Sequence, residues 1–293
     1  MNNLYLRIIS SLILLLIGFC MIATNDFMFL LIVQSFYLLS LWEYIRLIRF
    51  RNFEFDENNI RSNLLLSKTK VDLKNFLLIV SLVISCIFFY CSNFIISFIL
   101  FFFCLYSLNI LNKQNLLVTS GIIYISLPFF LLIYLSSLSD FKLYILFVIF
   151  FSLSVDTFAY FFGTRIGGRK LAPLISPSKT ISGTLGGIFI PTLICALVFY
   201  EQNSLLNIII FSILFSIVVQ IGDLIESKFK RICGVKDSSN IIPGHGGLLD
   251  RFDGIFLFLI LISLLTILDY NLFCLSNTLR STARVHIHNF LFQ

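Results

Sequence analysis

The stretch LLNIIIFSILFSIVVQIGDLIESKFKR, residues 205–231, decides the class of fold. Residues 205–222 carry no charge, and a run of about 20 mostly apolar residues crosses the roughly 30 Å of hydrocarbon in a bilayer when it is helical. Asp223, Glu226 and Lys230 then follow at helical spacing and share one face with Ser227. The stretch therefore predicts a membrane-spanning helix that ends in a polar face directed at protein or water.

The rest of the chain repeats this apolar character. Hydrophobic residues make up 58% of the 293 residues and charged residues only 12%, well below the roughly 25% of soluble domains. We therefore expect an all-α polytopic membrane protein of about nine transmembrane helices, whose cytoplasmic-side polar loops form an active site. The expected spans are residues 6–24, 27–45, 75–92, 94–111, 116–138, 143–162, 184–200, 205–222 and 254–272. The first span is interpreted as an uncleaved anchor rather than a secretory signal because another span follows it directly.

Three regions are expected along the chain. An N-terminal transmembrane region (1–142) contains a basic cytoplasmic loop at 46–74, which we interpret as a solvated connector. A catalytic transmembrane region (143–272) contains polar loops at 163–183 and 223–253. A C-terminal tail covers 273–293.

The basic residues predict the orientation. With the N-terminus inside, all of the 21 Lys and Arg residues except Lys142, Arg280 and Arg284 fall on the cytoplasmic side. The net charge of +6 is then spread along one membrane face, where it meets anionic lipids or a phosphorylated solute, and nucleic acid is not expected as a partner. A bacterial-type inner membrane with the active site facing the cytoplasm is the predicted location.

Chemistry concentrates in SKFKRICGVKDSSNIIPGHGGLLDRFD, residues 227–253. Charges close to hydrocarbon are costly and point to a function. The run Pro243 to Gly247 suits close approach of backbone N–H groups to a phosphate. The acids here and at Asp223 are hard oxygen ligands that, with phosphate oxygens, suit Mg²⁺. They are Asp223, Asp237, Asp250 and Asp253. Any one of them could instead only neutralise a neighbouring Lys or Arg.

A second polar segment is VDTFAYFFGTRIGGRKLAPLISPSKTISGTLGG, residues 155–187. Asp156 lies within an expected span, where a carboxylate is a functional candidate unless a neighbour such as Thr157 binds it. The residues that follow supply small hydroxyl side chains, a lysine and backbone amides, which are the groups that bind a triphosphate. The segment does not, however, match the GxxxxGK[ST] phosphate loop.

The chain resembles the phosphatidate cytidylyltransferases, also called CDP-diglyceride synthases. The resemblance is carried by the pattern S-x2-KR-x4-KD-x5-PGHGG-x2-DR-x-D from Ser227 to Asp253, by GDL at 222–224, by DT-x-AY at 156–160 and by KLAP-x-ISP-x-KT at 170–180. It covers at least residues 155–253. It implies transfer of CMP from CTP to phosphatidate, giving CDP-diacylglycerol and pyrophosphate, with Mg²⁺ required.

The resemblance also implies roles for single residues. Metal ligands would be Asp223 and Asp250, with Asp253 and Asp237 in support. Phosphate contacts would come from Lys230, Arg231, Lys236 and Arg251, and His245 with the amides of Gly246 and Gly247 would line the same pocket. CTP contacts would be Ser176, Lys179 and Thr180, with Asp156 also in the substrate site. Membrane lipids and a homodimer are the implied partners, and a second metal ion such as K⁺ is left open.

Two departures and two alternatives accompany this interpretation. Phe158 stands where many members have Gly, and Ile181-Ser182 replaces an aromatic residue followed by Glu or Gln, which puts one nucleotide contact in question. A CTP-dependent prenol-type kinase would release CDP instead of pyrophosphate. A transporter using Asp156 and Asp223 would need them to be reachable from both sides of the membrane.

Overall fold

The computed structural model describes residues 18, 26–52, 73–91, 94–111, 116–138, 141–199, 205–239, 241–242 and 246–268. The predicted span at 6–24, the connector from residue 53 to 72, His245 and the tail from residue 269 lie outside these residues, apart from the single residue 18.

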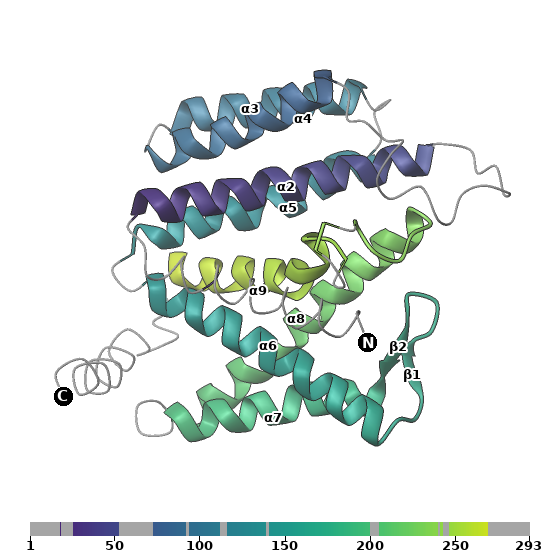
Figure 1. Cartoon of the computed structure of the whole chain (residues 1–293). Coiled ribbons are helices and arrows are strands. Elements are labelled where there is room, and N and C mark those ends of the chain that lie inside the picture. The colour runs from purple at the N-terminus through teal and green to yellow at the C-terminus, as the bar shows by residue number, and fades with distance from the viewer. Residues whose placement is uncertain are drawn as a thin grey trace, which may run out of the picture. The chain divides into compact units, whose positions relative to one another are not determined.

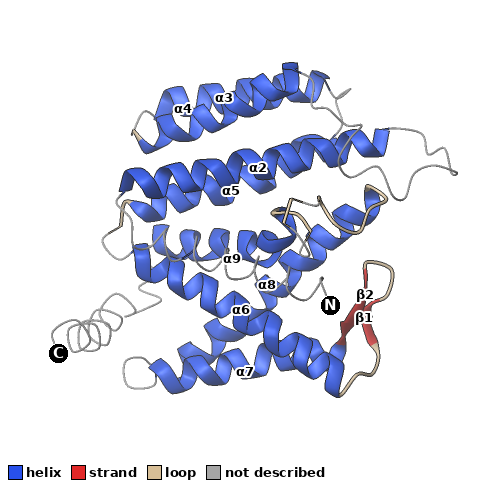
Figure 2. Cartoon of the chain, in the orientation of Figure 1, coloured by secondary structure: helices blue, strands red, loops and turns tan. Residues whose placement is uncertain are grey.

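Helices cover almost all of the described chain, which confirms the predicted all-α membrane class (Figure 2). They are α2 (Asp26–Asn52), α3 (Leu73–Tyr90), α4 (Phe94–Leu111), α5 (Leu116–Ser136), α6 (Phe141–Arg165), α7 (Ile181–Phe199), α8 (Leu205–Ile232) and α9 (Leu249–Ile267). Among the described residues, five segments are long and apolar enough to cross a membrane, and they lie in α2, α5, α6, α7 and α8. The count of nine spans stays a prediction.

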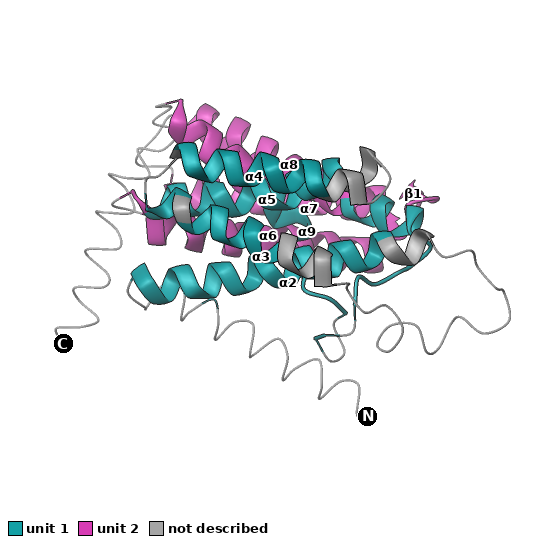
Figure 3. Ribbon diagram, turned by 90° about the horizontal axis from the view of Figure 1, so that it is seen from above, with its two compact units in different colours: residues 1–136, 226–256 teal, residues 137–225, 257–293 magenta. Residues whose placement is uncertain are grey.

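The chain divides into two compact units, each discontinuous in sequence (Figure 3). Unit 1 combines residues 1–136 with 226–256, and unit 2 combines 137–225 with 257–293. Helices α8 and α9 therefore each contribute to both units. The predicted boundary between residues 142 and 143 stays a prediction.

In unit 1, α2 packs beside α5, and α3 packs beside α4 (Figure 1). Tyr37 of α2 is fully buried and donates a hydrogen bond to Ser126 Oγ of α5 at 2.8 Å. A Cβ on Gly121 would lie 1.8 Å from the Tyr44 hydroxyl, so only glycine lets the two helices approach there. This contact holds the C-terminal part of α2, which carries site residues described below.

In unit 2, α6 crosses α7 at a contact between small residues (Figure 1). A Cβ on Gly183 would lie 2.5 Å from the Ala159 carbonyl, and one on Gly187 would lie 2.9 Å from the Val155 carbonyl. Close backbone approach through small residues is the usual means of packing helices in lipid. On α6 and α8, the rings of Phe151 and Phe215 pack edge to face with centroids 6.0 Å apart.

A β-hairpin joins α6 to α7, although the sequence predicted only a polar loop there. Strand β1 (Lys170–Ala172) pairs antiparallel with β2 (Ser176–Thr180), with Lys170 opposite Thr180 and a register irregularity between Lys170 and Ala172. The turn into it uses Gly167 and Gly168, whose φ angles of 66° and 99° suit glycine. The predicted nucleotide contacts at 176–180 therefore lie on a strand.

Candidate active site

Asp250, in the first turn of α9, is the most heavily hydrogen-bonded acid of the predicted site. Its Oδ2 accepts from Gly247 N at 2.7 Å, Ser238 N at 2.9 Å and Ser238 Oγ at 3.1 Å. Its Oδ1 accepts from Lys230 Nζ of α8 at 2.7 Å. The position at a helix N-terminus also favours its negative charge. Asp250 is thus held as a fixed anion between α8, the following loop and α9.

Burial of Asp250 opposes its ionisation, but the ammonium group of Lys230 and the backbone N–H groups of Gly247 and Ser238 outweigh that cost. The pKa of Asp250 therefore lies below its ordinary value. The carboxylate is ionised at neutral pH, as a cation ligand must be.

Lys230 also pairs with Glu226, one turn earlier on α8, at 3.3 Å. Both are buried, and Oε2 of Glu226 has no hydrogen-bond donor. Asp250 and Asp253 both act electrostatically on Glu226. Glu226, Asp250 and Asp253 therefore all act on the single ammonium group of Lys230 at this place in unit 1.

The loop between α8 and α9 is shaped by two glycines. Gly234 and Gly246 have φ angles of 73° and 85°, and a Cβ on Gly246 would lie 2.7 Å from Asp250 Oδ2. Ile242 N donates to Gly246 O at 2.9 Å. The Gly247 amide points at Asp250. It was predicted to line a phosphate pocket, and in this structure it holds a carboxylate.

The other predicted residues of this loop are mostly exposed. Lys236, Asp237 and Arg251 lie at the surface, and exposed Arg231 donates to Val235 O at 3.2 Å. Asp253 Oδ1 accepts from Gly254 N at 2.8 Å. Arg231, Lys236 and Arg251 give this part of unit 1 exposed positive charges, which attract an anionic ligand.

The second predicted cluster lies in unit 2. Lys179 of β2 pairs with Asp223 of α8 at 2.5 Å, and its Nζ lies 3.5 Å from Gln220 O. Gln220 in turn donates to Thr184 O of α7 at 3.2 Å. This arrangement joins the hairpin to α8. Asp156 is exposed on α6.

Thr180 and Ser176 are both buried. Thr180 Oγ1 accepts from Gly183 N at 3.1 Å, so Thr180 caps the N-terminus of α7. Ser182 Oγ donates to Gly167 O, which ties the start of α7 to the turn before β1. Ser182, which stands where the family pattern has Glu or Gln, thus has a hydrogen-bond partner in this structure.

Sequence reasoning missed Glu43 on α2. This fully buried carboxylate accepts from Ser238 Oγ at 3.1 Å, Leu248 N at 3.0 Å, Leu249 N at 2.9 Å and Ser239 Oγ. It lies inside the predicted span 27–45, so the rule applied to Asp156, that an intramembrane carboxylate is a functional candidate, would have found it.

Arg46, one turn after Glu43, was predicted to begin a solvated connector. Instead Arg46 is buried and donates to Ser238 O at 3.3 Å, because its helix continues to Asn52 and packs against the loop after α8. The prediction was wrong for this residue.

A sequence model described as the cytidylyltransferase family matches residues 5–268. The chain belongs to this family. The resemblance seen in the motifs is thereby confirmed at the level of the family, and the match includes every residue of the predicted site.

Two curated relatives that this chain resembles are bacterial proteins. The phosphatidate cytidylyltransferase of Staphylococcus haemolyticus (strain JCSC1435) is 45% identical over 132 residues, which are 44% of this chain and 51% of that protein. That of Staphylococcus aureus (strain COL) is 44% identical over 127 residues, 42% of this chain and 49% of that protein. The alignments span about half the length of the curated relatives that the chain matches.

The side-chain oxygens around Lys230 are of the chemical kind that a divalent cation binds. In the part of the chain that the structure describes, no group of three His, Cys, Asp or Glu side chains is close enough to enclose an ion. Mg²⁺ usually takes only one or two carboxylates and completes its shell with substrate phosphates and water. Oε2 of Glu226, which has no donor and interacts electrostatically with Asp250 and Asp253, is an oxygen atom of the kind that such an ion binds.

The structure brings together Asp250, Lys230 and the loop amides in unit 1, and Lys179 with Asp223 in unit 2. Helix α8 carries Asp223, Glu226 and Lys230 at the predicted spacing. The pairing of Asp223 with Asp250 around one metal ion stays a prediction.

Proposed function

We propose that this cytidylyltransferase transfers CMP from CTP to phosphatidate at the cytoplasmic surface of the inner membrane, giving CDP-diacylglycerol and pyrophosphate. The observation that carries the proposal is the fixed, ionised Asp250 beside Lys230 and the exposed basic residues of the same part of unit 1. This is the arrangement that two anionic substrates require if they are to meet. The family supports the reaction type.

In this reaction a phosphate oxygen of phosphatidate attacks the α-phosphorus of CTP, and the bond from that phosphorus to the bridging oxygen of pyrophosphate breaks. No enzyme nucleophile is needed because the lipid supplies it. Arg231, Lys236 and Arg251 would hold the phosphates by charge, mainly through positioning and electrostatic stabilisation. When CTP binds, the ammonium group of Lys179 would leave its ion pair with Asp223 and bind a phosphate of CTP instead.

Mg²⁺ is the proposed cofactor, and Asp250 and Asp223 would hold it with Asp253 and Asp237 in support. It would neutralise charge on the phosphates and on the departing pyrophosphate. Lys230, which pairs with Asp250 and Glu226, would keep the carboxylate of Asp250 in place.

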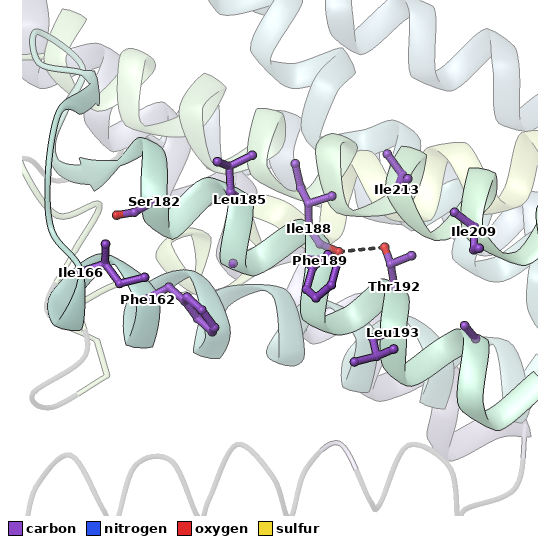
Figure 4. Close-up of a pocket in the computed structure, with 12 residues that line it drawn as sticks. Phe162, Ile166, Ser182, Leu185, Ile188, Phe189, Thr192, Leu193, Ile209 and Ile213 are labelled. Atoms are coloured by element: carbon purple, nitrogen blue, oxygen red, sulfur yellow. Dashed lines mark hydrogen bonds between the residues drawn. The ribbon is translucent and has the colours of Figure 1, made fainter.

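An apolar groove in unit 2 suits an acyl chain of phosphatidate. It measures about 650 Å³ and is lined by α6, α7 and α8, with Ser182 and Ile166 at one end and Thr192, Leu193 and Ile209 toward the other (Figure 4). Thr192 donates its hydroxyl to Ile188 O at 2.7 Å, so it presents no free donor to the groove. The Ser182 end adjoins the hairpin that carries Lys179, which would place a lipid phosphate near the polar residues.

The decisive experiment incubates purified protein with labelled CTP, phosphatidate and Mg²⁺ and identifies the products. Wild type should give CDP-diacylglycerol and pyrophosphate, and Asp250→Asn should lose nearly all activity because the fixed charge is lost. Asp26→Asn, an exposed Asp at the start of α2, is the matched control and should remain active. Release of CDP with a phosphorylated lipid would instead identify a kinase. Absence of any product would refute the proposal.

A further inference from the structure

The carboxylate of Glu43 accepts hydrogen bonds from the segment that precedes α9 and from the start of α9. Its four donors are two serine hydroxyls, Ser238 and Ser239, and two backbone amides, Leu248 and Leu249. These donors are 195 to 206 residues away in the sequence. Helix α2 of unit 1 thus reaches a loop that sequence motifs assign to catalysis.

A fully buried carboxylate is tolerated only if donors replace its water. Leu248 and Leu249 lie where the N–H groups of a helix have no partner within the helix. Glu43 therefore acts as a cap for α9 supplied by another helix. Movement of the first turn of α9 would break the bonds from Leu248 and Leu249 and leave the buried charge with only its two serine donors.

Ser238 links Glu43 to Asp250. Its hydroxyl lies 3.1 Å from both Glu43 Oε2 and Asp250 Oδ2, and its backbone N–H donates to Asp250 Oδ2 at 2.9 Å. Arg46 holds the carbonyl of the same residue at 3.3 Å. Two residues of the C-terminal part of α2 therefore bind Ser238, since Glu43 binds its hydroxyl and Arg46 binds its carbonyl. The backbone N–H of Ser238 donates to Asp250.

We propose that Glu43 is a positioning residue that sets the carboxylate of Asp250 in its working geometry, through Ser238 and the first turn of α9. Glu43 touches neither substrate nor metal in this proposal. The effect on the loop stands without any assumption about the reaction, and the effect on turnover rests on the proposed function.

The first test measures amide hydrogen exchange in the full-length protein in detergent, in peptides that cover Leu248 and Leu249. A hydrogen bond to a charged group is worth about 1.5–3 kcal/mol, so Glu43→Gln should speed exchange there by roughly tenfold to a hundredfold. Peptides from α7 should be unchanged. Gln34→Ala, which alters another buried polar side chain of α2, is the matched control and should leave exchange at 248–249 as in wild type.

The second test measures turnover and the Mg²⁺ concentration for half-maximal activity. Glu43→Gln should lower kcat by about tenfold or more and raise that concentration, and Glu43→Asp should recover part of both because it keeps the charge. A merely structural role would reduce the amount of active enzyme without moving the Mg²⁺ midpoint. Ser239→Ala, which removes one donor with little change in volume, should shift both values in the same direction if the Glu43 variants do not fold.

Unchanged exchange at Leu248 and Leu249 in Glu43→Gln would overturn the proposal, and so would an unchanged Mg²⁺ midpoint in an active variant. Inactive wild type would count against the proposed reaction alone, because the exchange measurement does not use substrate.

Discussion

The ammonium group of Lys230 lies between two carboxylates, Asp250 at 2.7 Å and Glu226 at 3.3 Å. All three side chains are largely buried, where an ion without a partner is strongly unfavourable. The ion pair between Lys230 and Asp250 therefore explains how Asp250 stays ionised inside unit 1. It also gives Lys230 a structural role beside the phosphate contact that the motif implies.

Lys230→Gln tests this role. The substitution leaves two buried carboxylates without their cation, and removal of one partner of a buried pair costs about 3–5 kcal/mol. We expect the free energy of unfolding, measured by titration with SDS, to fall by about that amount. Lys228→Gln, at an exposed position two residues away on α8, should change it by less than about 0.5 kcal/mol. Equal stability of the two variants would contradict the role of the pair.

At the scale of elements, the crossing of α6 and α7 positions the β-hairpin, since β2 runs directly into α7 and Thr180 caps that helix. The crossing is close because Gly183 packs against Gly163, with a Cβ on Gly183 lying 3.2 Å from the Gly163 Cα. Lys179 then meets Asp223 from this hairpin.

Gly183→Ala should therefore destabilise the protein. In an open helix the same change would stabilise by up to about 1 kcal/mol, but here the new methyl group would lie 2.5 Å from the Ala159 carbonyl. We expect a loss of about 1–3 kcal/mol through overpacking, measured as a lower midpoint of thermal unfolding in detergent. A higher midpoint would show that the two helices are not in contact at this position.

A larger side chain placed in the groove of unit 2 tests whether the groove binds an acyl chain of phosphatidate. Ala196 lines it on α7, so Ala196→Phe should raise the KM for long-chain phosphatidate several-fold, by about 1 kcal/mol or more of lost binding. The KM for CTP should not change. Leu197→Phe, at the neighbouring exposed position, is the matched control. An equal effect of both variants, or an effect on CTP, would refute the proposed acyl-chain site.

At the scale of the whole molecule, the membrane arrangement is expected to follow the distribution of basic residues. Five described segments have the length and composition of membrane spans. Lys142, at the start of α6, is predicted to face outward, while Lys228 near the end of α8 is predicted to face the cytoplasm. Both are exposed.

Labelling of introduced cysteines tests this orientation. In spheroplasts, a membrane-impermeant maleimide should react with Lys142→Cys when added from outside, and with Lys228→Cys only after the membrane is opened. The positive-inside rule is the reason for this expectation. The unmodified chain, whose seven cysteines, exposed Cys91 among them, set the background, is the control. Labelling of Lys228→Cys in intact spheroplasts would place the proposed active site on the wrong side for cytoplasmic CTP.

The sequence by itself determined the helical membrane class, the position of most helices and the family. Backbone groups in hydrocarbon must be satisfied within their own segment, so an apolar run is enough to predict a helix. The acids and bases of residues 223–253 were visible for a related reason, since charges beside hydrocarbon are costly and stand out.

Only the tertiary structure decided which partner each of these residues has. Glu43 binds donors as far as 206 residues away, Lys179 meets Asp223 across 44 positions of the chain, and β2 forms where a loop was expected. Such contacts leave no periodic pattern because they depend on how separate helices pack. An acidic residue within an apolar run can be recognised in the sequence as a group that will need hydrogen-bond donors. Which residues donate to it is decided by the fold.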